Sequence, residues 1–319
     1  MCYSAMVWAD YRSYTRAFGA VISIEEFSRL FKARLDGAKI TVPKATADSF
    51  SEPANAAERE IQSLVVAYNE MEAARLEKEV FRQRARLADA ERQLSTKETK
   101  RAFEDRRIAT AKIDQSLGRL RDLKRTEARD RDSRIYPGTY VPVMVEEHGR
   151  LVVKPTRYQC RPAGRPAIYD RKYPGTYNAR RDNLEGYWRD QFGKSHGIMV
   201  ATSFFENVSR HRLEHRELAS DEQPENVVLK FDPNDGGPMI VACLYSHWTG
   251  GAGEPDLWSF AAITDAPPPE IAAAGHDRCI VPIKRKNLGS WLRPEASLAS
   301  SYAILDDRER PGYQFEVAA

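Results

Sequence analysis

The sequence predicts an α+β fold in which a β-rich domain is interrupted by a long helical arm. Residues 133–319 contain short apolar runs of strand length, separated by turns that contain Pro and Gly. Residues 55–132 are dense in Ala, Glu, Arg, Lys and Leu, contain no proline, and have Gly118 as their only glycine, a composition typical of long helices. Strand and helix patterns therefore occupy different parts of the chain, which favours an α+β arrangement over a repeated βαβ unit.

Residues 1–54 are predicted to supply the N-terminal part of the β-rich domain and a linker. Ser23-Ile-Glu-Glu26 is a capping box, which predicts the start of a helix. The apolar positions behind it follow helical spacing and are Ile24, Phe27, Leu30, Phe31 and Leu35. Residues 38–54 are rich in Pro, Ala, Ser and Thr, so we expect them to connect this helix to the arm.

The arm at 55–132 carries two apolar patterns that are typical of packed helices. Val80, Leu87 and Leu94 recur every seven residues. A second group, with spacings of three and four, consists of Ile61, Leu64, Tyr68 and Met71. We therefore expect one or two long helices, as an antiparallel hairpin or a coiled-coil arm. Its basic second half could contact a phosphate backbone or form a solvated face, and the arm could also mediate self-association or bind a partner protein.

Residues 133–319 are predicted to form the main β-rich part. The runs with the aromatic and β-branched content of strands are Tyr140–Val145, Gly197–Thr202, Met239–Tyr245 and Trp258–Thr264. Turn signals such as Pro137-Gly138 and Gly250-Gly251 separate them. One helix is expected at Pro268–Ala274.

Composition limits the classes of protein to consider. The chain has 319 residues, a formal charge of +3 and a pI near 8.6, a mild basic bias that permits nucleic-acid binding without requiring it. The four cysteines lie far apart with no C-x-x-C pair, which argues against a disulfide framework and a zinc ribbon. No apolar run is long enough to span a bilayer, and no signal-like segment begins the chain. We expect a cytoplasmic protein.

Two further motifs do not predict a nucleotide or metal site. Gly193-Lys194-Ser195 resembles the end of a P-loop, but the first glycine of that motif would fall at Trp188. The four side chains that could bind zinc are Cys243, His247, His276 and Cys279. Because Cys243 lies within an apolar strand, where a small buried thiol is ordinary packing, we expect no metal and no other cofactor.

Cys2 directly follows Met1, and a side chain this small permits removal of the initiator Met. The new terminus would then carry an amine and a thiol on neighbouring carbon atoms. These groups titrate at about 8 and 8.5 when free, so both are partly reactive at neutral pH. Such an aminothiol condenses with an aldehyde to an imine, which the thiol closes to a thiazolidine ring. Cys2 is therefore a candidate nucleophile.

Three later segments supply candidate partners for Cys2. Tyr177–Leu184 is polar and follows a Pro-Gly turn, and it contains Asn178. Ile198–Glu206 is an apolar strand that runs through two aromatic residues into a carboxylate. Apolar rings raise the pKa of a neighbouring Glu, which suits an acid/base near neutrality. His276 stands between the predicted helix and an apolar run.

Together these segments resemble the SOS-response-associated peptidase (SRAP) family. The motifs that carry the resemblance are Met1-Cys2, Asn178-Ala179-Arg180, Val200–Glu206, His276–Pro282 and Arg134–Val143. The similarity covers roughly residues 1–36 and 133–292, and the arm resembles an insertion. The chain departs from the family where Tyr3-Ser4 replaces the usual Gly-Arg, and where Arg157-Tyr158-Gln159 stands in place of an aromatic R-W-G segment.

The resemblance implies covalent capture of abasic sites in single-stranded DNA, through a thiazolidine between Cys2 and the ring-opened sugar aldehyde. It also implies autoproteolytic removal of Met1 or a leader, hence a combined peptidase and lyase-like activity. Asn178 would hold the terminal amine, Glu206 would transfer protons, His276 would act on the sugar oxygen, and Thr264 would support the pocket. The residues that would contact DNA are Arg180, Arg134 and Arg157, at phosphates, and Tyr158, by stacking on a base. The protein would associate with the nucleoid when bound to DNA.

Two other function classes remain open from the sequence. In the first, Cys2 and His276 form an ordinary cysteine peptidase that acts on protein substrates and has no role at DNA. In the second, the chain is a non-enzymatic protein that binds DNA or a partner through the helical arm. The first class does not require its cysteine at position 2, and the order of Cys2, Asn178, Glu206 and His276 in the chain argues against the second.

Overall fold

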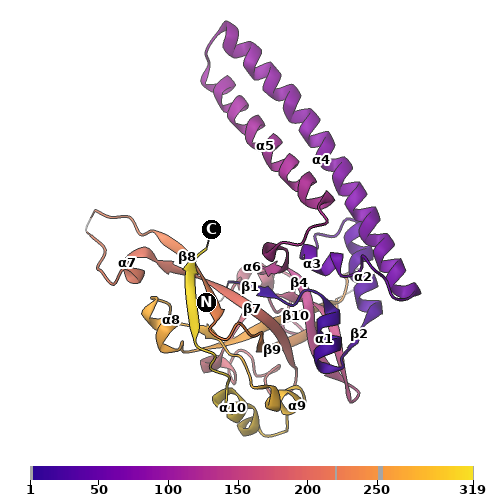
Figure 1. The fold of residues 1–319 in the computed structure, drawn as a ribbon, viewed down its shortest axis with the longest axis vertical. Helices are drawn as coiled ribbons and strands as arrows, with labels where there is room; N and C mark the ends of the chain where they lie inside the picture. Colours follow the sequence, from indigo (N-terminus) through magenta and orange to yellow (C-terminus); the bar gives the residue numbers. More distant parts are fainter. Residues whose placement is uncertain (1–2, 220, 251–253, 319) are drawn as a thin grey trace. The chain divides into compact units, whose positions relative to one another are not determined.

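The computed structural model describes residues 3–219, 221–250 and 254–318, and it confirms the predicted α+β class (Figure 1). The chain divides into two compact units. The first, the β-rich unit, is built from Met1–Leu30, Lys39–Glu52 and Asp130–Ala319, and the second, the arm unit, from Phe31–Ala38 and Pro53–Arg129. None of the helices in the described ranges is long and apolar enough to cross a membrane.

A closed ring of five strands forms the centre of the β-rich unit. β10 pairs in parallel with β5, and the antiparallel pairs β5–β4, β4–β7, β7–β9 and β9–β10 complete the ring. The bounds of these strands are β4 (Tyr140–Glu147), β5 (Arg150–Tyr158), β7 (His196–Ser209), β9 (Met239–Trp248) and β10 (Leu257–Asp265). Each predicted apolar run lies within one of these strands, and their inward side chains form one hydrophobic core.

Further strands pair with the strands of this ring or with one another. They are β1 (Ser4–Val7), β2 (Val21–Ile22), β3 (Arg134–Ile135), β6 (Asn178–Arg180), β8 (Asn226–Pro233), β11 (Cys279–Ile280) and β12 (Tyr313–Val317). β1 and β8 pair with β7, whereas β6 and β11 pair with β10. The long strands β7 and β10 therefore pair with segments that are far apart in the sequence.

Short helices pack around the β-rich unit. They are α1 (Tyr11–Phe18), α3 (Lys44–Asp48), α6 (Tyr169–Lys172), α7 (Arg210–Leu213), α8 (Pro269–Ala273), α9 (Leu288–Leu292) and α10 (Leu298–Asp306), with 3₁₀ turns η1 (Asp130–Ser133), η2 (Arg181–Asn183) and η3 (Arg285–Asn287). The predicted helix at Pro268–Ala274 corresponds to α8. The helix predicted behind the capping box corresponds to α2 (Ile24–Leu35).

Residues 39–52 differ from a simple linker, because they are packed into the β-rich unit. Phe50 is fully buried, and its ring stacks on Tyr11 with centroids 5.2 Å apart. The Arg12 guanidinium donates to the Glu52 carbonyl oxygen at 2.9 Å. A composition rich in Pro, Ser and Thr does not reveal this packing, because one aromatic side chain is sufficient to anchor the segment.

A buried histidine fixes the beginning of β7. His196 Nδ1 lies 2.9 Å from the Trp291 carbonyl oxygen, and Nε2 accepts a hydrogen bond from the Gly193 amide at 2.8 Å. These two contacts require a neutral ring that carries its proton on Nδ1, and burial lowers the pKa of His196 to about 4. The Gly193-Lys194-Ser195 segment is thus the loop before a strand, and its glycine amide is already bound.

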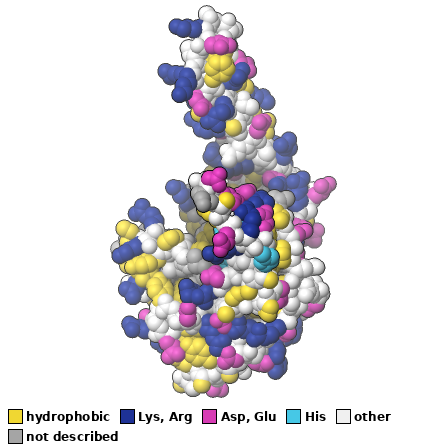
Figure 2. All heavy atoms as spheres, turned by 90° about the vertical axis from the view of Figure 1, so that its left-hand side faces the viewer, with side chains coloured by type: hydrophobic (Ala, Val, Ile, Leu, Met, Phe, Trp, Pro, Cys, Tyr) yellow, Lys and Arg dark blue, Asp and Glu magenta, His cyan; other side chains and the backbone are white. Residues whose placement is uncertain are grey.

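The arm unit contains an antiparallel helical hairpin formed by α4 (Ala56–Thr96) and α5 (Lys100–Lys124). The side chains of Asn55 and Thr99 cap the two helices by accepting from backbone amides of their first turns. Leu76, Val80 and Leu120 form a small apolar cluster between the helices. On the face drawn in Figure 2, Lys and Arg side chains are interspersed with Asp and Glu along the arm. The hairpin is the predicted helical insertion, and its binding partner stays a prediction.

We expect the distal part of the arm to be dispensable for folding of the β-rich unit. Val80 and Leu120 belong to one cluster, so a short Gly/Ser loop can join them in place of residues 81–119. Because loop length costs little free energy, the β-rich unit should change in stability by less than about 1 kcal/mol. Thermal unfolding followed by near-UV circular dichroism would measure this.

Phe50→Ala is the matched variant for this experiment. Removal of its fully buried ring should destabilise the same unit by about 3–5 kcal/mol. If the parent protein unfolds cooperatively and the variant with the shortened arm does not, the arm is required for the β-rich unit to fold.

Candidate active site

A buried carboxylate and a histidine form the centre of the candidate site. Glu206 lies on β7 and is 1% exposed. Its Oε2 lies 3.2 Å from His276 Nε2, in the loop between α8 and β11. Glu206 shares a face of β7 with Phe204 and Val208, which belong to the main hydrophobic core, since side chains two residues apart on a strand point the same way. The alternation of the strand therefore directs this carboxyl group into the apolar interior.

Burial sets the protonation of this pair. Desolvation raises the pKa of Glu206 to about 8, and the charge of Asp277 adds to the effect. Desolvation also lowers the pKa of His276, against the opposing hydrogen bond to the Arg278 backbone. Nδ1 of His276 lies 2.8 Å from the Arg278 carbonyl oxygen, so Nδ1 carries the ring proton and Nε2 is an acceptor. Near neutrality, a protonated Glu206 therefore faces an unprotonated Nε2, and one proton can move between them.

Two further predicted residues lie on strands next to each other. β6 pairs with β10 so that Asn178 is opposite Ala262 and Arg180 is opposite Thr264, which places Asn178 and Thr264 on one face. Ala262 on that face belongs to the same hydrophobic core as Phe204. Asn178 and Thr264 are buried, and their side-chain polar atoms have no hydrogen-bond partner among the described residues. Such groups are costly to bury unless a ligand or water satisfies them.

Aromatic rings and one arginine surround the beginning of β1. Ser4 is opposite Phe205 in the β1–β7 register. Arg134 donates to the Ser4 hydroxyl at 2.9 Å, and its guanidinium lies over the Phe205 ring at 3.6 Å. The Tyr3 ring packs edge-on against Tyr177, with centroids 6.1 Å apart. Arg134 is thus held beside Glu206's strand.

Arg180 belongs to an ion-pair network that the sequence did not reveal. Asp182 accepts from Arg180 Nη2 at 2.6 Å and from Arg278 Nη2 at 3.3 Å. Arg278 is two residues after His276, so this carboxylate links the Asn178 segment to the histidine loop. Asp277 also acts electrostatically on Arg180, so the charges of the two arginines are balanced by two carboxylates beside the site. The sequence does not reveal this role of Arg278, because only the fold brings Asp182 close to it.

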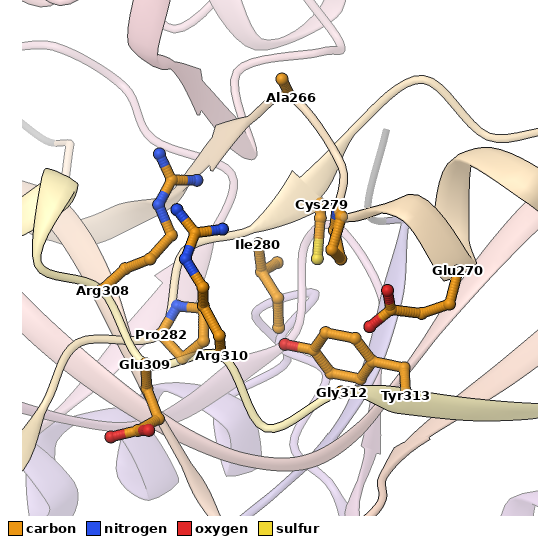
Figure 3. Close-up of a pocket in the computed structure, with 11 residues that line it drawn as sticks. Ala266, Glu270, Cys279, Ile280, Pro282, Arg308, Glu309, Arg310, Gly312 and Tyr313 are labelled. Atoms are coloured by element: carbon orange, nitrogen blue, oxygen red, sulfur yellow. The ribbon is translucent and has the colours of Figure 1, made fainter.

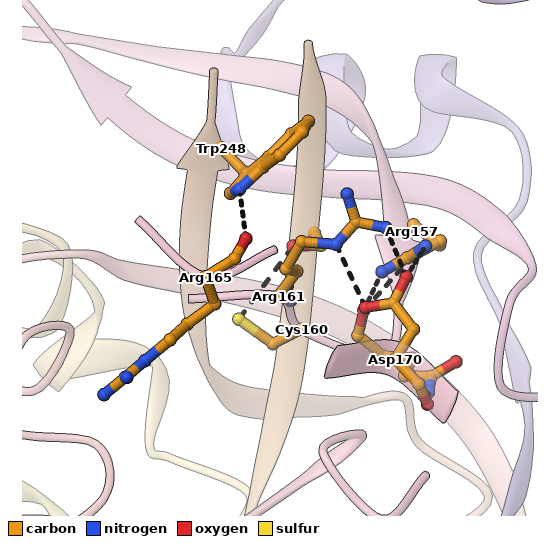
Figure 4. Close-up of polar contacts among 8 residues, drawn as sticks. Arg157, Cys160, Arg161, Arg165, Asp170 and Trp248 are labelled. Carbon is orange, nitrogen blue, oxygen red and sulfur yellow. Dashed lines mark hydrogen bonds and ion pairs between the residues drawn. The ribbon is translucent and has the colours of Figure 1, made fainter. Parts of the chain in front are cut away.

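Arg157 and Tyr158 are placed differently. Figure 4 shows Arg157 and Arg161 both directed at Asp170, with Arg157 Nη1 2.8 Å from its Oδ2. Burial opposes ionisation of Asp170, but the two arginines hold its pKa below the usual value. Tyr158 is 1% exposed and stacks on Phe260. Contact of either residue with DNA would require this packing to open.

Cys2 lies outside the described residues, so the structure contains no geometry for it. The other three cysteines, Cys160, Cys243 and Cys279, are free and buried. The residues considered for zinc do not gather at one point: His247 pairs with Asp256, whereas His276 pairs with Glu206. The described part of the chain contains no group of three or more His, Cys, Asp or Glu side chains that could hold a metal ion.

A sequence model of the family described as "SOS response associated peptidase (SRAP)" matches residues 94–316, which is more than half of the chain. The chain belongs to this family. The resemblance inferred from the motifs is thereby confirmed. Asn178, Glu206, Thr264 and His276 all lie within the matched residues, whereas Cys2 and most of α4 precede them.

Three crystal structures are similar to parts of this SRAP chain. A protein from Bacteroides thetaiotaomicron is 16% identical, covers 54% of this chain and 72% of its own, and has a TM-score of 0.45. A protein from Bordetella bronchiseptica is 19% identical, covers 63% of this chain and 95% of its own, and has a TM-score of 0.47. A phage-related protein from Bordetella bronchiseptica is 16% identical, covers 61% and 85%, and has a TM-score of 0.44. No curated protein matches the sequence.

A small cavity beside β11 is not a substrate site. Figure 3 shows Cys279, Glu270 and Tyr313 around it, with Arg308 and Arg310 on the other side. Its volume of about 30 Å³ is in the range that holds a water molecule. This is far below the size of pockets that bind organic ligands, about 300–1,000 Å³. The cavity therefore fits solvent.

We expect the stability of Glu206→Gln, relative to wild type, to increase as the pH rises. In the unfolded chain this carboxyl has its ordinary pKa of 4.5, whereas in the folded chain its pKa is about 8. The unfolded state thus binds fewer protons between these values, so wild-type stability falls as pH rises. The free energy of unfolding of the variant should gain on wild type by up to about 1.4 kcal/mol per pH unit in that window.

Denaturant unfolding at pH 4.5, 6 and 8 would measure this difference. Glu309→Gln removes an exposed carboxylate and serves as the control. A difference between Glu206→Gln and wild type that does not change with pH would contradict a buried, protonated Glu206.

Proposed function

We propose that this SRAP protein captures abasic sites in single-stranded DNA through a thiazolidine formed by Cys2 after removal of Met1. The observation that carries the proposal is the buried Glu206–His276 pair, which holds a transferable proton at neutral pH. The ring-opened sugar supplies an aldehyde at C1. The amine of Cys2 adds to it, water leaves to give the imine, and the thiol adds to the imine carbon. One aldehyde and one aminothiol thus give one thiazolidine and one water.

The state of the other thiols supports Cys2 as the nucleophile. Burial raises the pKa of Cys160 to about 12 and raises the pKa of Cys243 and Cys279 as well. Because the thiolate is the reactive form, these three side chains are poor nucleophiles. Cys2 is the remaining cysteine in the sequence.

The surroundings of the first described residues also support the proposal. Cys2 is joined to Tyr3, whose ring packs against Tyr177, the residue before Asn178. On the other side of Ser4, the β1–β7 register leads to Phe205, the residue before Glu206. The two strands that carry Asn178 and Glu206 are thus neighbours of the chain that continues from Cys2.

The pair fits the proton transfers that imine formation needs. A protonated Glu206 can donate its proton to the hydroxyl that leaves as water, and the proton that the thiol releases on ring closure can restore it. His276 Nε2, 3.2 Å away, is an acceptor that can hold this proton in between. Burial raises the pKa of Glu206 to about 8, close to neutrality, where acid/base catalysis is most effective, and it lowers the pKa of His276, which favours the neutral ring as an acceptor. Asn178, with its unpartnered amide, would orient the amine, and Thr264 would supply a further hydroxyl to the pocket.

Phosphate contacts follow from the charged groups near this pair. Arg180 is about half exposed, so its guanidinium can meet a phosphate although it pairs with Asp182. Arg134 is held beside Phe205 and is another candidate. Such contacts position a strand without reading its sequence. Autoproteolytic removal of Met1 or a leader would use the same Glu206 and Cys2.

A plain cysteine peptidase is less well supported. Its histidine would have to accept the thiol proton of Cys2, but Nε2 of His276 faces Glu206 at 3.2 Å and Nδ1 contacts the Arg278 carbonyl oxygen at 2.8 Å. Both ring nitrogens are therefore already engaged. A peptidase of this kind would require the histidine loop to move.

Cys2→Ala should abolish a covalent adduct with single-stranded DNA that contains one abasic site. Noncovalent affinity should stay within about twofold of wild type, because phosphate contacts supply most of the binding energy. A gel shift that survives denaturation measures the adduct, and fluorescence anisotropy with intact DNA measures binding. An adduct at the wild-type rate in Cys2→Ala would remove Cys2 from the chemistry.

Blocking the N-terminus separates the proposal from a thiol peptidase. Acetylated protein, or protein with an extension that is not removed, keeps the Cys2 thiol but lacks the amine. We expect complete loss of the adduct, since the ring requires both groups. The unblocked protein from the same preparation is the control. Normal adduct formation by the blocked protein would instead favour a side-chain nucleophile.

A further inference from the structure

A cavity of about 330 Å³ lies next to Asn178. The segment from Lys172 to Thr176 lines one part of it, and Asn183, Tyr187 and Trp188 line another. Its volume is within the range of about 300–1,000 Å³ for pockets that bind organic ligands. It is about ten times larger than the solvent cavity beside Cys279, and the proposed mechanism assigns it no role.

Two buried polar side chains line this cavity without a partner. Asn178 is 5% exposed and Thr176 is 6% exposed. Neither the Asn178 amide atoms nor the Thr176 hydroxyl has a hydrogen-bond partner in the described parts of the chain. These polar atoms are themselves buried, so they lie within the wall of the cavity, and a ligand would contact the more exposed side chains around it.

An aromatic ring and two cations lie at the same cavity. Tyr173 is 38% exposed, and its ring is supported by Tyr169, with centroids 4.2 Å apart. Lys172 Nζ lies 5.5 Å from the Tyr173 ring centroid, and Arg180 also lines the cavity with a half-exposed side chain. An exposed ring and two cations together match the base and the phosphate of a nucleotide.

We propose that this cavity binds the nucleotide next to the abasic residue, with its base on Tyr173 and its phosphate between Lys172 and Arg180. The inference rests on the proposed function, and it moves base stacking from the buried Tyr158 to the exposed Tyr173. Asn178 connects the two sites, because it belongs to the catalytic group and also lines the cavity. Stacking on an aromatic ring does not depend on the identity of the base, so the pocket accepts different bases.

The test uses three single-stranded oligonucleotides with one central abasic site. One is complete, and the others carry a baseless tetrahydrofuran spacer directly 5′ or directly 3′ of that site. The dissociation constant is measured by anisotropy with full-length Cys2→Ala protein, and adduct yield with wild type. The same constants are measured for Tyr173→Ala and Tyr173→Phe, each combined with Cys2→Ala. Ile168→Ala, an exposed residue that does not line the cavity, is the control in the same segment.

We expect one of the two spacers, and not the other, to weaken binding about tenfold, as loss of one base–aromatic stack does. Tyr173→Ala should weaken binding of the complete strand by the same factor and should leave the strand with that spacer unaffected. Tyr173→Phe and Ile168→Ala should bind as the parent does. Equal weakening of all three strands by Tyr173→Ala, or no effect of either spacer, overturns the nucleotide site. Adduct formation by wild type on all three strands would still support the proposed function, whereas no adduct on any strand would reject that function itself.

Discussion

A carboxyl group held inside an apolar ring of strands is the constraint on which the candidate chemistry depends. Glu206 points inward because its position on β7 alternates with outward-facing residues, and its neighbours Phe204 and Val208 are core residues. Desolvation there raises its pKa to about 8 and would destabilise the folded chain at alkaline pH. His276 is the group that faces it, at 3.2 Å. The protein thus retains a costly buried acid at the place where the proposed mechanism transfers a proton.

The same strands explain why residues distant in sequence meet. β7 and β10 are neighbours through β9 in the closed ring, and each collects short edge strands. β1 and β6 bring the N-terminal segment and Asn178, whereas β11 follows the loop that carries His276. An edge strand needs only two or three residues to fix a side chain, since its register is set by the long strand beside it. The helical hairpin can therefore be inserted between β1 and β3 as a separate compact unit.

The arginines near the site are paired with carboxylates. Asp182 holds Arg180 and Arg278, and Asp170 holds Arg157 and Arg161. The first pair is more exposed than the second, so the two clusters that look alike in sequence differ in what they can contact. Exposure leaves Arg180 accessible for the proposed phosphate contact, whereas burial makes Arg157 part of the support beneath the loop that leads to Asn178.

The sequence by itself determined the α+β class, the helical arm, the strands that carry the core and the family. These features are periodic or local, because apolar spacing, turn residues and short motifs are properties of neighbouring positions. The packing of residues 39–52 could not be predicted in this way, since one buried aromatic residue, Phe50, hardly changes the composition of the segment. Only the tertiary structure decided that Asp182 bridges Arg180 to Arg278, that Tyr158 is inaccessible, and that Tyr173 and Thr176 share a cavity with Asn178. Burial and ion pairing depend on which strands become neighbours, and no local pattern in the chain specifies that.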